Sequence, residues 1–175
     1  MSALKEVTNR LVMHWGEMAR SWGISKTMGQ VHALLYVSGR EWSAEEIMEE
    51  LEISRGNASM SLRELVNWGL VSRIHHRGER RDFYAAEPDV WEIFNRIIAE
   101  RKRREIDPTI VALSQYSDMI RESDESGAED ALRRVENLRE FFEAMDRFHQ
   151  RFTPHSKADV DQAAQLVKIN VEGLS

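Results

Sequence analysis

The segment from Ser43 to Ala86 constrains the fold most, because two helix start signals, a short turn and a strand pattern follow one another without a linker. Ser43 and Glu46 have the spacing of a capping box, in which the hydroxyl and the carboxylate satisfy free backbone N–H groups at a helix start. Ser54 is a second N-cap candidate, and it opens a helix that Gly69 ends. The sequence therefore predicts two helices joined by a short turn.

The residues after Gly69 have the composition of a two-stranded hairpin. Residues 70–76 and 81–86 are enriched in Val, Ile, Phe and Tyr, and residues 77–80 between them form a tight turn that contains a glycine. A capped helix, a short turn, a second helix and a hairpin, in this order, are typical of a winged helix-turn-helix. We therefore predict a mainly α fold with a small β-hairpin wing, and we assign residues 24–90 to this domain.

The second of these helices begins with small and hydrogen-bonding residues, as expected of a helix whose N-terminal end enters the major groove of DNA. Arginine can pair with guanine and asparagine with adenine, while glycine lets the backbone approach the duplex closely. Arginines on the hairpin turn can contact phosphates or enter the minor groove. The predicted DNA-binding residues are Ser54, Arg55, Gly56, Asn57, Ser59, Met60, Arg63, Arg77, Arg80 and Arg81.

The charge distribution places a basic segment within an acidic chain. The formal net charge of −6 argues against a protein that coats nucleic acid non-specifically. Residues 53–104 hold 11 Lys+Arg and 7 Asp+Glu, or +4, so the rest of the chain, with 13 and 23, carries −10. A polar helix start or arginines at a hairpin tip are each common on ordinary surfaces. Their order and spacing together favour DNA binding.

Amphipathic helices flank the predicted winged domain. Residues 4–22 place apolar side chains at three- and four-residue steps, and residues 128–152 carry a long apolar stripe. Stripes of this length favour a second helical surface, and hence a homodimer, over a helical layer within one chain. Residues 1–23 and 91–175 are therefore assigned to a dimerisation region with N- and C-terminal helices.

Two further helix starts are predicted in the last third of the chain. Asp107 and Pro108 have the pattern of an N-cap followed by a first-turn proline, which would start a new helix at this point. Ser156 with Asp159 could cap a final helix, and Gly173 lies where that helix should end.

Composition and motifs exclude several other classes of protein. The chain has no cysteine, so disulfide and thiolate chemistry are absent, and no apolar run approaches the roughly 20 residues of a membrane span. No export signal is recognisable, so we expect a cytoplasmic protein. No phosphate-binding glycine loop, Gly-x-Ser-x-Gly or His-Glu-x-x-His motif is present. We therefore expect neither an enzyme nor a bound metal or other cofactor.

Three runs of residues resemble MarR-type regulators, and more closely their GbsR-like branch. These are SRGNASMSLREL at 54–65, WGLV at 68–71 and GERRDFY at 78–84. The tryptophan at position 91 and the basic run at 101–104 also resemble that branch. The resemblance implies a dimeric transcription regulator, more often a repressor than an activator, whose terminal helices interlock. The family's wing usually carries Asp where this chain has Glu79.

A winged-helix module that binds a partner protein instead of double-stranded DNA is the main alternative. Such an adaptor should lose polar and basic residues at Arg55, Asn57, Arg80 and Arg81, and this chain has all four. The sequence leaves open whether a small-molecule effector controls the spacing of the two recognition helices in a dimer.

Overall fold

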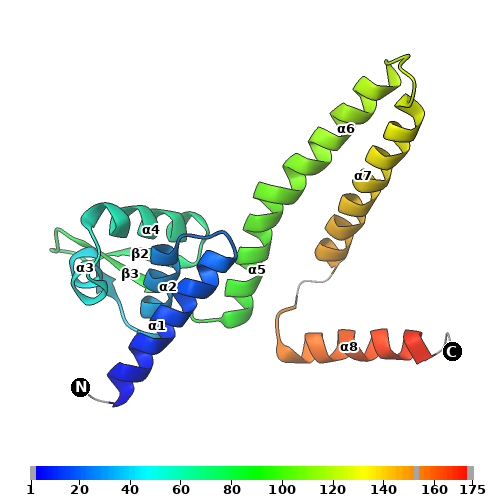
Figure 1. Ribbon diagram of the computed structural model, residues 1–175. Coiled ribbons are helices and arrows are strands. Elements are labelled where there is room, and N and C mark those ends of the chain that lie inside the picture. Colours follow the sequence, from blue (N-terminus) through cyan, green and yellow to red (C-terminus); the bar gives the residue numbers. More distant parts are fainter. Residues whose placement is uncertain (1–2, 152–153, 173–175) are drawn as a thin grey trace. The chain divides into compact units, whose positions relative to one another are not determined.

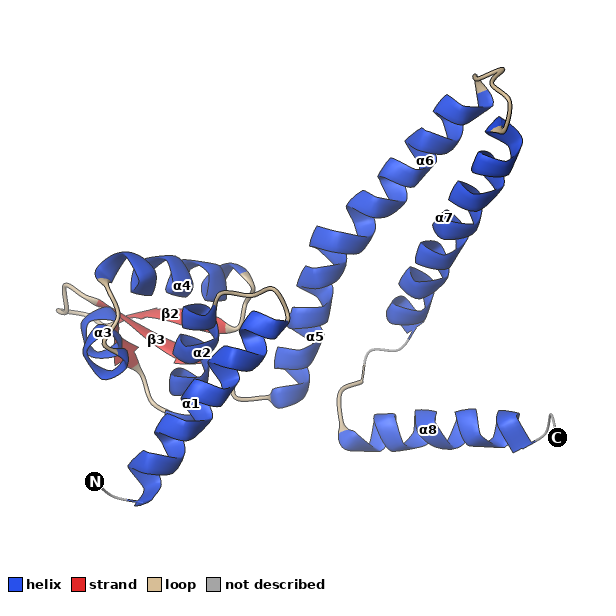
Figure 2. Ribbon diagram, in the orientation of Figure 1, coloured by secondary structure: helices blue, strands red, loops and turns tan. Residues whose placement is uncertain are grey.

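The computed structural model describes residues 3–151 and 154–172, the last seven of these as backbone only. The chain divides between Arg96 and Ile97 into two units. The elements of the two units are shown in Figure 1, and Figure 2 shows that helices dominate both, with the strands confined to the first unit. The boundary of the winged domain at residue 90 stays a prediction. The role of the flanking helices in dimerisation also stays a prediction.

The first unit holds α1 (Ala3–Ser21), α2 (Lys26–Ser38), β1 (Trp42–Ser43), α3 (Ala44–Leu51), α4 (Arg55–Asn67), β2 (Val71–His75), β3 (Asp82–Ala86) and the start of α5 (Val90–Arg101). The second holds the end of α5, the π turn η1 (Lys102–Ile106), α6 (Asp107–Arg121), α7 (Ala128–Arg151) and α8 (Lys157–Glu172).

Helices α1 and α2 lie side by side in the first unit (Figure 1) and meet through small residues. A Cβ added at Gly29 would lie 2.6 Å from the Cβ of Ala19, and one added at Gly16 would lie 2.6 Å from Cγ of Gln30. Side chains larger than glycine would therefore push the two helices apart. Leu4 and Val7, near the other end of α1, are exposed.

The core of the first unit is formed by α2, α3, α4 and the start of β2. Its buried apolar side chains include Val31, Leu34, Leu35, Ile47, Ala58, Leu62, Leu65, Leu70 and Val71. Both predicted helix starts in this region are confirmed. The backbone N–H of Ser43 donates to Oε2 of Glu46 at 2.8 Å, and this hydrogen bond lowers the pKa of Glu46. The N–H of Asn57 donates to Oγ of Ser54 at 3.3 Å.

The sheet has three strands, whereas the sequence predicted only the two of the hairpin. The strand order is β1-β3-β2, and Trp42 and Ser43 of β1 pair with Tyr84 and Phe83 of β3 in antiparallel register. A two-residue strand is too short to show alternation. In addition, Ser43 serves both as a strand residue and as the N-cap of α3, so the helix start signal hides the strand.

A new helix, α6, begins at Asp107 as predicted, but Asp107 is not its N-cap, and the chain stays helical before it. Asp107 has helical dihedral angles of φ −58° and ψ −47°, and the chain continues from α5 through η1 into α6. Its N–H donates to the carbonyl of Lys102, five residues earlier, as in a π helix. A proline ring clashes with the carbonyl four residues before it in a regular α-helix, and the wider π turn relieves this clash at Pro108.

The apolar stripe of α7 is only partly covered. Helices α6 and α7 form a hairpin (Figure 1), and Leu132, Val135 and Phe142 of α7 are half-buried. The other side of the stripe is open, with Phe141 57% and Met145 47% exposed. Among the side chains described in the second unit, no Leu, Ile, Val, Phe or Met is fully buried.

The start of α8 is confirmed, because the N–H of Asp159 donates to Oγ of Ser156 at 3.3 Å. In return, Asp159 accepts a 2.7 Å hydrogen bond from the N–H of His155. Residue 152 and Gly173, at the predicted ends of two helices, lie outside the described residues. None of the described helices combines the length and the apolar character that crossing a membrane requires.

His32 of α2 makes the stability of the first unit depend on pH. It is only 5% exposed, its Nε2 atom has no hydrogen-bond partner, and burial lowers its pKa from 6.5 to about 4. The imidazole is therefore neutral in the folded chain, while the unfolded chain takes up a proton below pH 6.5. This contribution to stability is complete above pH 6.5 and is lost as the pH falls toward 4.

We expect the folded chain to lose about 2 kcal/mol of unfolding free energy through His32 between pH 7 and pH 5. Urea unfolding at both pH values, at one chain concentration, measures this loss in the native chain and in His32→Leu, whose side chain cannot titrate. The unfolding free energy that is lost through protonation of carboxylates is the same in both proteins, so the difference between them reports on His32. An equal loss in the two proteins would show that His32 does not resist protonation.

Candidate nucleic-acid interface

One face of α4 is buried and the opposite face is exposed. Ala58, Leu62 and Leu65 pack into the core. Gly56, Met60, Arg63 and Asn67 are exposed and follow one another at steps of four, three and four residues, so they lie along one side of the helix. We call these four residues the outer row. The sequence prediction included the first three and missed Asn67, which the same spacing would have indicated.

Gly56 is a glycine that the fold does not require. A Cβ added there would meet only Oγ of Ser54, at 4.0 Å, which is ordinary van der Waals contact. Its backbone is helical, and it is not among the residues with positive φ. No described residue of the first unit therefore prevents a second molecule from approaching the backbone of α4 at this point.

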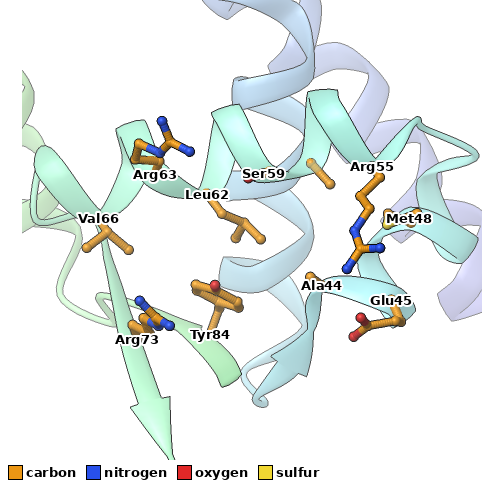
Figure 3. A pocket seen from close by; sticks show the side chains of 11 residues that line it. Ala44, Glu45, Met48, Arg55, Ser59, Leu62, Arg63, Val66, Arg73 and Tyr84 are labelled. Atoms are coloured by element: carbon orange, nitrogen blue, oxygen red, sulfur yellow. The ribbon is translucent and has the colours of Figure 1, made fainter. Parts of the chain in front are cut away.

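The remaining predicted residues of the first turn flank the outer row. The hydroxyl of Ser54 is occupied as the N-cap of α4, so its role in this structure is to start the helix. Arg55, Asn57 and Ser59 are exposed. In Figure 3 the side chain of Arg55 extends from α4 toward Ala44 and Glu45 at the start of α3.

A hollow of about 360 Å³ lies between α3, α4 and the sheet (Figure 3). We call it the α4–wing hollow. It is lined by Ala44, Glu45, Met48, Arg55, Ala58, Ser59, Leu62, Arg63, Val66, Arg73 and Tyr84. Three guanidinium groups and one carboxylate are among these side chains, so the lining has an excess of positive charge. Figure 3 shows Tyr84 and Arg73 opposite α4, while Arg63 extends from the side of α4 turned away from Tyr84.

Arg73 and Tyr84 were missed by the sequence prediction. They are paired in register across β2 and β3, so their side chains share the face of the sheet that is turned toward α4. Arg73 donates to Asp82, which raises the pKa of Arg73 and lowers that of Asp82. Burial raises the pKa of Tyr84. The imperfect alternation of β2 gave no signal for this face.

The tip of the wing is exposed and rich in arginine. Gly78 has a φ of 89°, a conformation that side chains rarely adopt, and the N–H of Glu79 closes the turn on the carbonyl of His76 at 3.1 Å. Arg77, Arg80 and Arg81 are all exposed. The Nε atom of Arg81 lies 3.7 Å from Oε2 of Glu79, so these two side chains form an ion pair at the tip.

The basic run at 101–104 in the second unit is engaged by carboxylates. Lys102 lies 2.5 Å from Asp107 and 3.0 Å from Asp146 of α7, and Arg103 lies 2.6 Å from Glu100. Side chains held in this way are less available for phosphate. The described residues of both units contain no group of three or more metal-ligating side chains.

Comparison with known proteins finds a family profile that resembles the segment holding α3, α4 and β2. The family profile described as "MarR family" matches residues 22–82, from before α2 to the first residue of β3. The segment that holds the helix-turn-helix is therefore similar to the MarR family. This confirms the resemblance seen in the sequence, and it agrees with the expectation that the chain is not an enzyme.

Two curated relatives of this chain are from Bacillus subtilis (strain 168). "HTH-type transcriptional repressor GbsR" is 23% identical over 114 residues, which cover 65% of this chain and 63% of the relative. "HTH-type transcriptional repressor OpcR" is 21% identical over 99 residues, which cover 57% of this chain and 54% of the relative. The chain therefore spans less than two thirds of the length of these relatives.

A solved structure described as a transcriptional regulator supports the fold beyond the segment that the family profile matches. It has a TM-score of 0.56 and 22% identity, and it covers 82% of this chain and 92% of the solved chain. At this identity the likeness concerns the fold alone. The similarity in fold therefore also includes helices that flank the winged helix-turn-helix.

Proposed function

We propose that this chain is a MarR-type, sequence-specific repressor of transcription that binds double-stranded DNA as a cytoplasmic homodimer. One observation carries the DNA-binding part: α4 presents an exposed outer row opposite its buried face, and the fold leaves the space around Gly56 empty. A helix that enters the major groove needs such a face. The printed names of GbsR and OpcR support repression, and their similarity to this chain supports the GbsR-like branch.

The positions of the polar side chains suggest a division of roles. Arg55 and Asn57, in the first turn of α4, are the candidates for pairing with base edges. Arg63, which is exposed further along α4, is the candidate for a phosphate of the DNA backbone. The exposed arginines of the wing tip are candidates for further phosphate or minor-groove contacts.

The second unit supports the homodimer. Its described Leu, Ile, Val, Phe and Met side chains are all at least partly accessible, and a helical hairpin without a buried core is not expected to be stable alone in water. Leu138, Phe141 and Met145 lie at steps of three and four residues on the open side of α7. We call them the α7 stripe. A second copy of the chain that covers this stripe would also provide the second α4 that a palindromic site requires.

Selection of duplexes from a random pool tests this proposal. The purified chain is incubated with the pool, bound duplexes are recovered and sequenced, and the mass of the chain is measured in parallel by light scattering. We expect an enriched palindrome and a mass of twice the 20.4 kDa of the chain. A folded dimer that enriches no duplex sequence over several rounds would contradict the proposal.

Arg80→Ala tests the role of the wing in this proposal. A lysine or arginine that neutralises a DNA phosphate adds about 0.9 to the slope of log affinity against log salt concentration. We expect Arg80→Ala to weaken binding to specific and random duplexes alike, and to reduce this slope by about 1 per bound wing. Fluorescence anisotropy over a series of salt concentrations measures both. An unchanged slope would remove Arg80 from the phosphate contacts.

A further inference from the structure

Met60 is an exposed apolar side chain in the middle of a polar surface. It is 62% exposed and occupies the outer row between Gly56 and Arg63. All residues from 43 to 86 are described, and Met60 is the one large apolar side chain among them that is exposed. The core needs no side chain at this position, because Ala58, Leu62 and Leu65 fill the buried face of α4.

The chemistry of the major groove suggests what Met60 contacts. Bases present hydrogen-bond donors and acceptors there, and thymine alone adds a methyl group, on C5. Arg55 and Asn57, earlier on α4, suit these polar groups. An unbranched and flexible thioether side chain suits an apolar contact of irregular shape. With the open backbone of Gly56 one turn earlier, α4 can come close enough for Met60 to reach a base edge.

We propose that Met60 determines specificity by packing against the C5 methyl group of a thymine in the major groove. This inference rests on the proposed function, because it requires that α4 enters the groove of a specific duplex. It adds a preference that hydrogen bonding does not supply. Cytosine offers no methyl group, and uracil differs from thymine by this group alone.

Replacement of single thymines by deoxyuridine in the selected duplex tests the inference. Loss of one buried methyl group corresponds to about a fourfold loss of affinity. We expect one thymine in each half-site at which deoxyuridine weakens binding of the native chain by this factor. Met60→Ala should bind the thymine and deoxyuridine duplexes equally, whereas Met60→Leu, which keeps an apolar side chain, should retain a preference for thymine.

Val37→Ala is the control, because Val37 is an exposed apolar side chain of the same unit on α2, outside the outer row and outside the predicted dimerisation region. It should keep the full preference for thymine. Equal binding of both duplexes by the native chain, or an unchanged preference in Met60→Ala, would overturn the role of Met60 while leaving specific DNA binding intact. If no duplex is selected at all, the proposed function fails, and this inference fails with it.

Discussion

Phe141→Glu is expected to turn the dimer into a monomer and to weaken binding to the selected duplex by at least about a hundredfold. Phe141 is the middle residue of the α7 stripe and is 57% exposed. Covered by a second copy, a carboxylate there would lose its hydration without gaining a partner, which costs far more than the apolar contact it replaces. A monomer also loses the gain in effective concentration that links the two half-site contacts, which is about 10²- to 10⁴-fold.

Light scattering gives the mass of the variant, and fluorescence anisotropy gives its affinity for the duplex. Arg147→Glu is the matched control, because it also introduces a carboxylate on α7 but on the charged side of the helix, where Arg147 approaches Glu143 at 3.9 Å. The control should remain dimeric and bind the duplex. If Phe141→Glu keeps the mass of a dimer, the α7 stripe is not part of the dimer interface.

Gly56→Ala is expected to change stability and DNA binding in opposite directions. Alanine favours a helix over glycine by roughly 1 kcal/mol, and the added methyl group would meet no atom of the chain closer than 4.0 Å. The free energy of unfolding should therefore rise by about 0.5–1 kcal/mol. If the DNA comes into contact with this backbone, the same methyl group is an overpacking defect that costs about 1–3 kcal/mol of binding, or roughly five- to 150-fold in affinity.

Urea unfolding and anisotropy titration of one preparation give the two quantities. An Ala substitution at an exposed helical position outside the predicted interface provides the comparison, and Val37→Ala on α2 suits this purpose. This control should bind DNA with unchanged affinity. A Gly56→Ala chain that is more stable and binds with unchanged affinity would contradict close approach of the duplex at Gly56.

The helix starts could be predicted because their signals are local. The capping box of Ser43 and Glu46 and the N-cap at Ser54 depend on residues three positions apart, and both occur where the sequence placed them. The wing turn was predictable for the same reason, since Gly78 supplies the positive φ that the turn requires. Such features need no knowledge of tertiary packing.

The errors arose where local signals conflict with packing or are too short. Asp107 and Pro108 have the pattern of a helix start, yet a π turn lets the helix continue through them. Strand β1 has two residues, one of which is also an N-cap. Arg73 and Tyr84 come together only through the register of β2 and β3, which the irregular alternation of β2 did not reveal.

The contact surfaces of the second unit could not be predicted from the sequence for a different reason. The sequence indicated more apolar surface on α7 than one chain of this size can cover, and the structure divides that surface into a side toward α6 and the open α7 stripe. Which residues fall on which side depends on how α6 and α7 pack, and the heptad-like spacing alone is compatible with several rotations of the helix.

The central claim, sequence-specific recognition of DNA, is tested most directly by comparing two affinities. One is the affinity for the selected palindrome, and the other is that for a scrambled duplex of the same length and composition. Anisotropy titrations of the dimer at about 0.15 M salt keep the non-specific electrostatic contribution the same for both duplexes. The proposed function predicts binding at least about a thousandfold tighter to the palindrome. Equal affinities for the two duplexes would contradict sequence-specific recognition by α4.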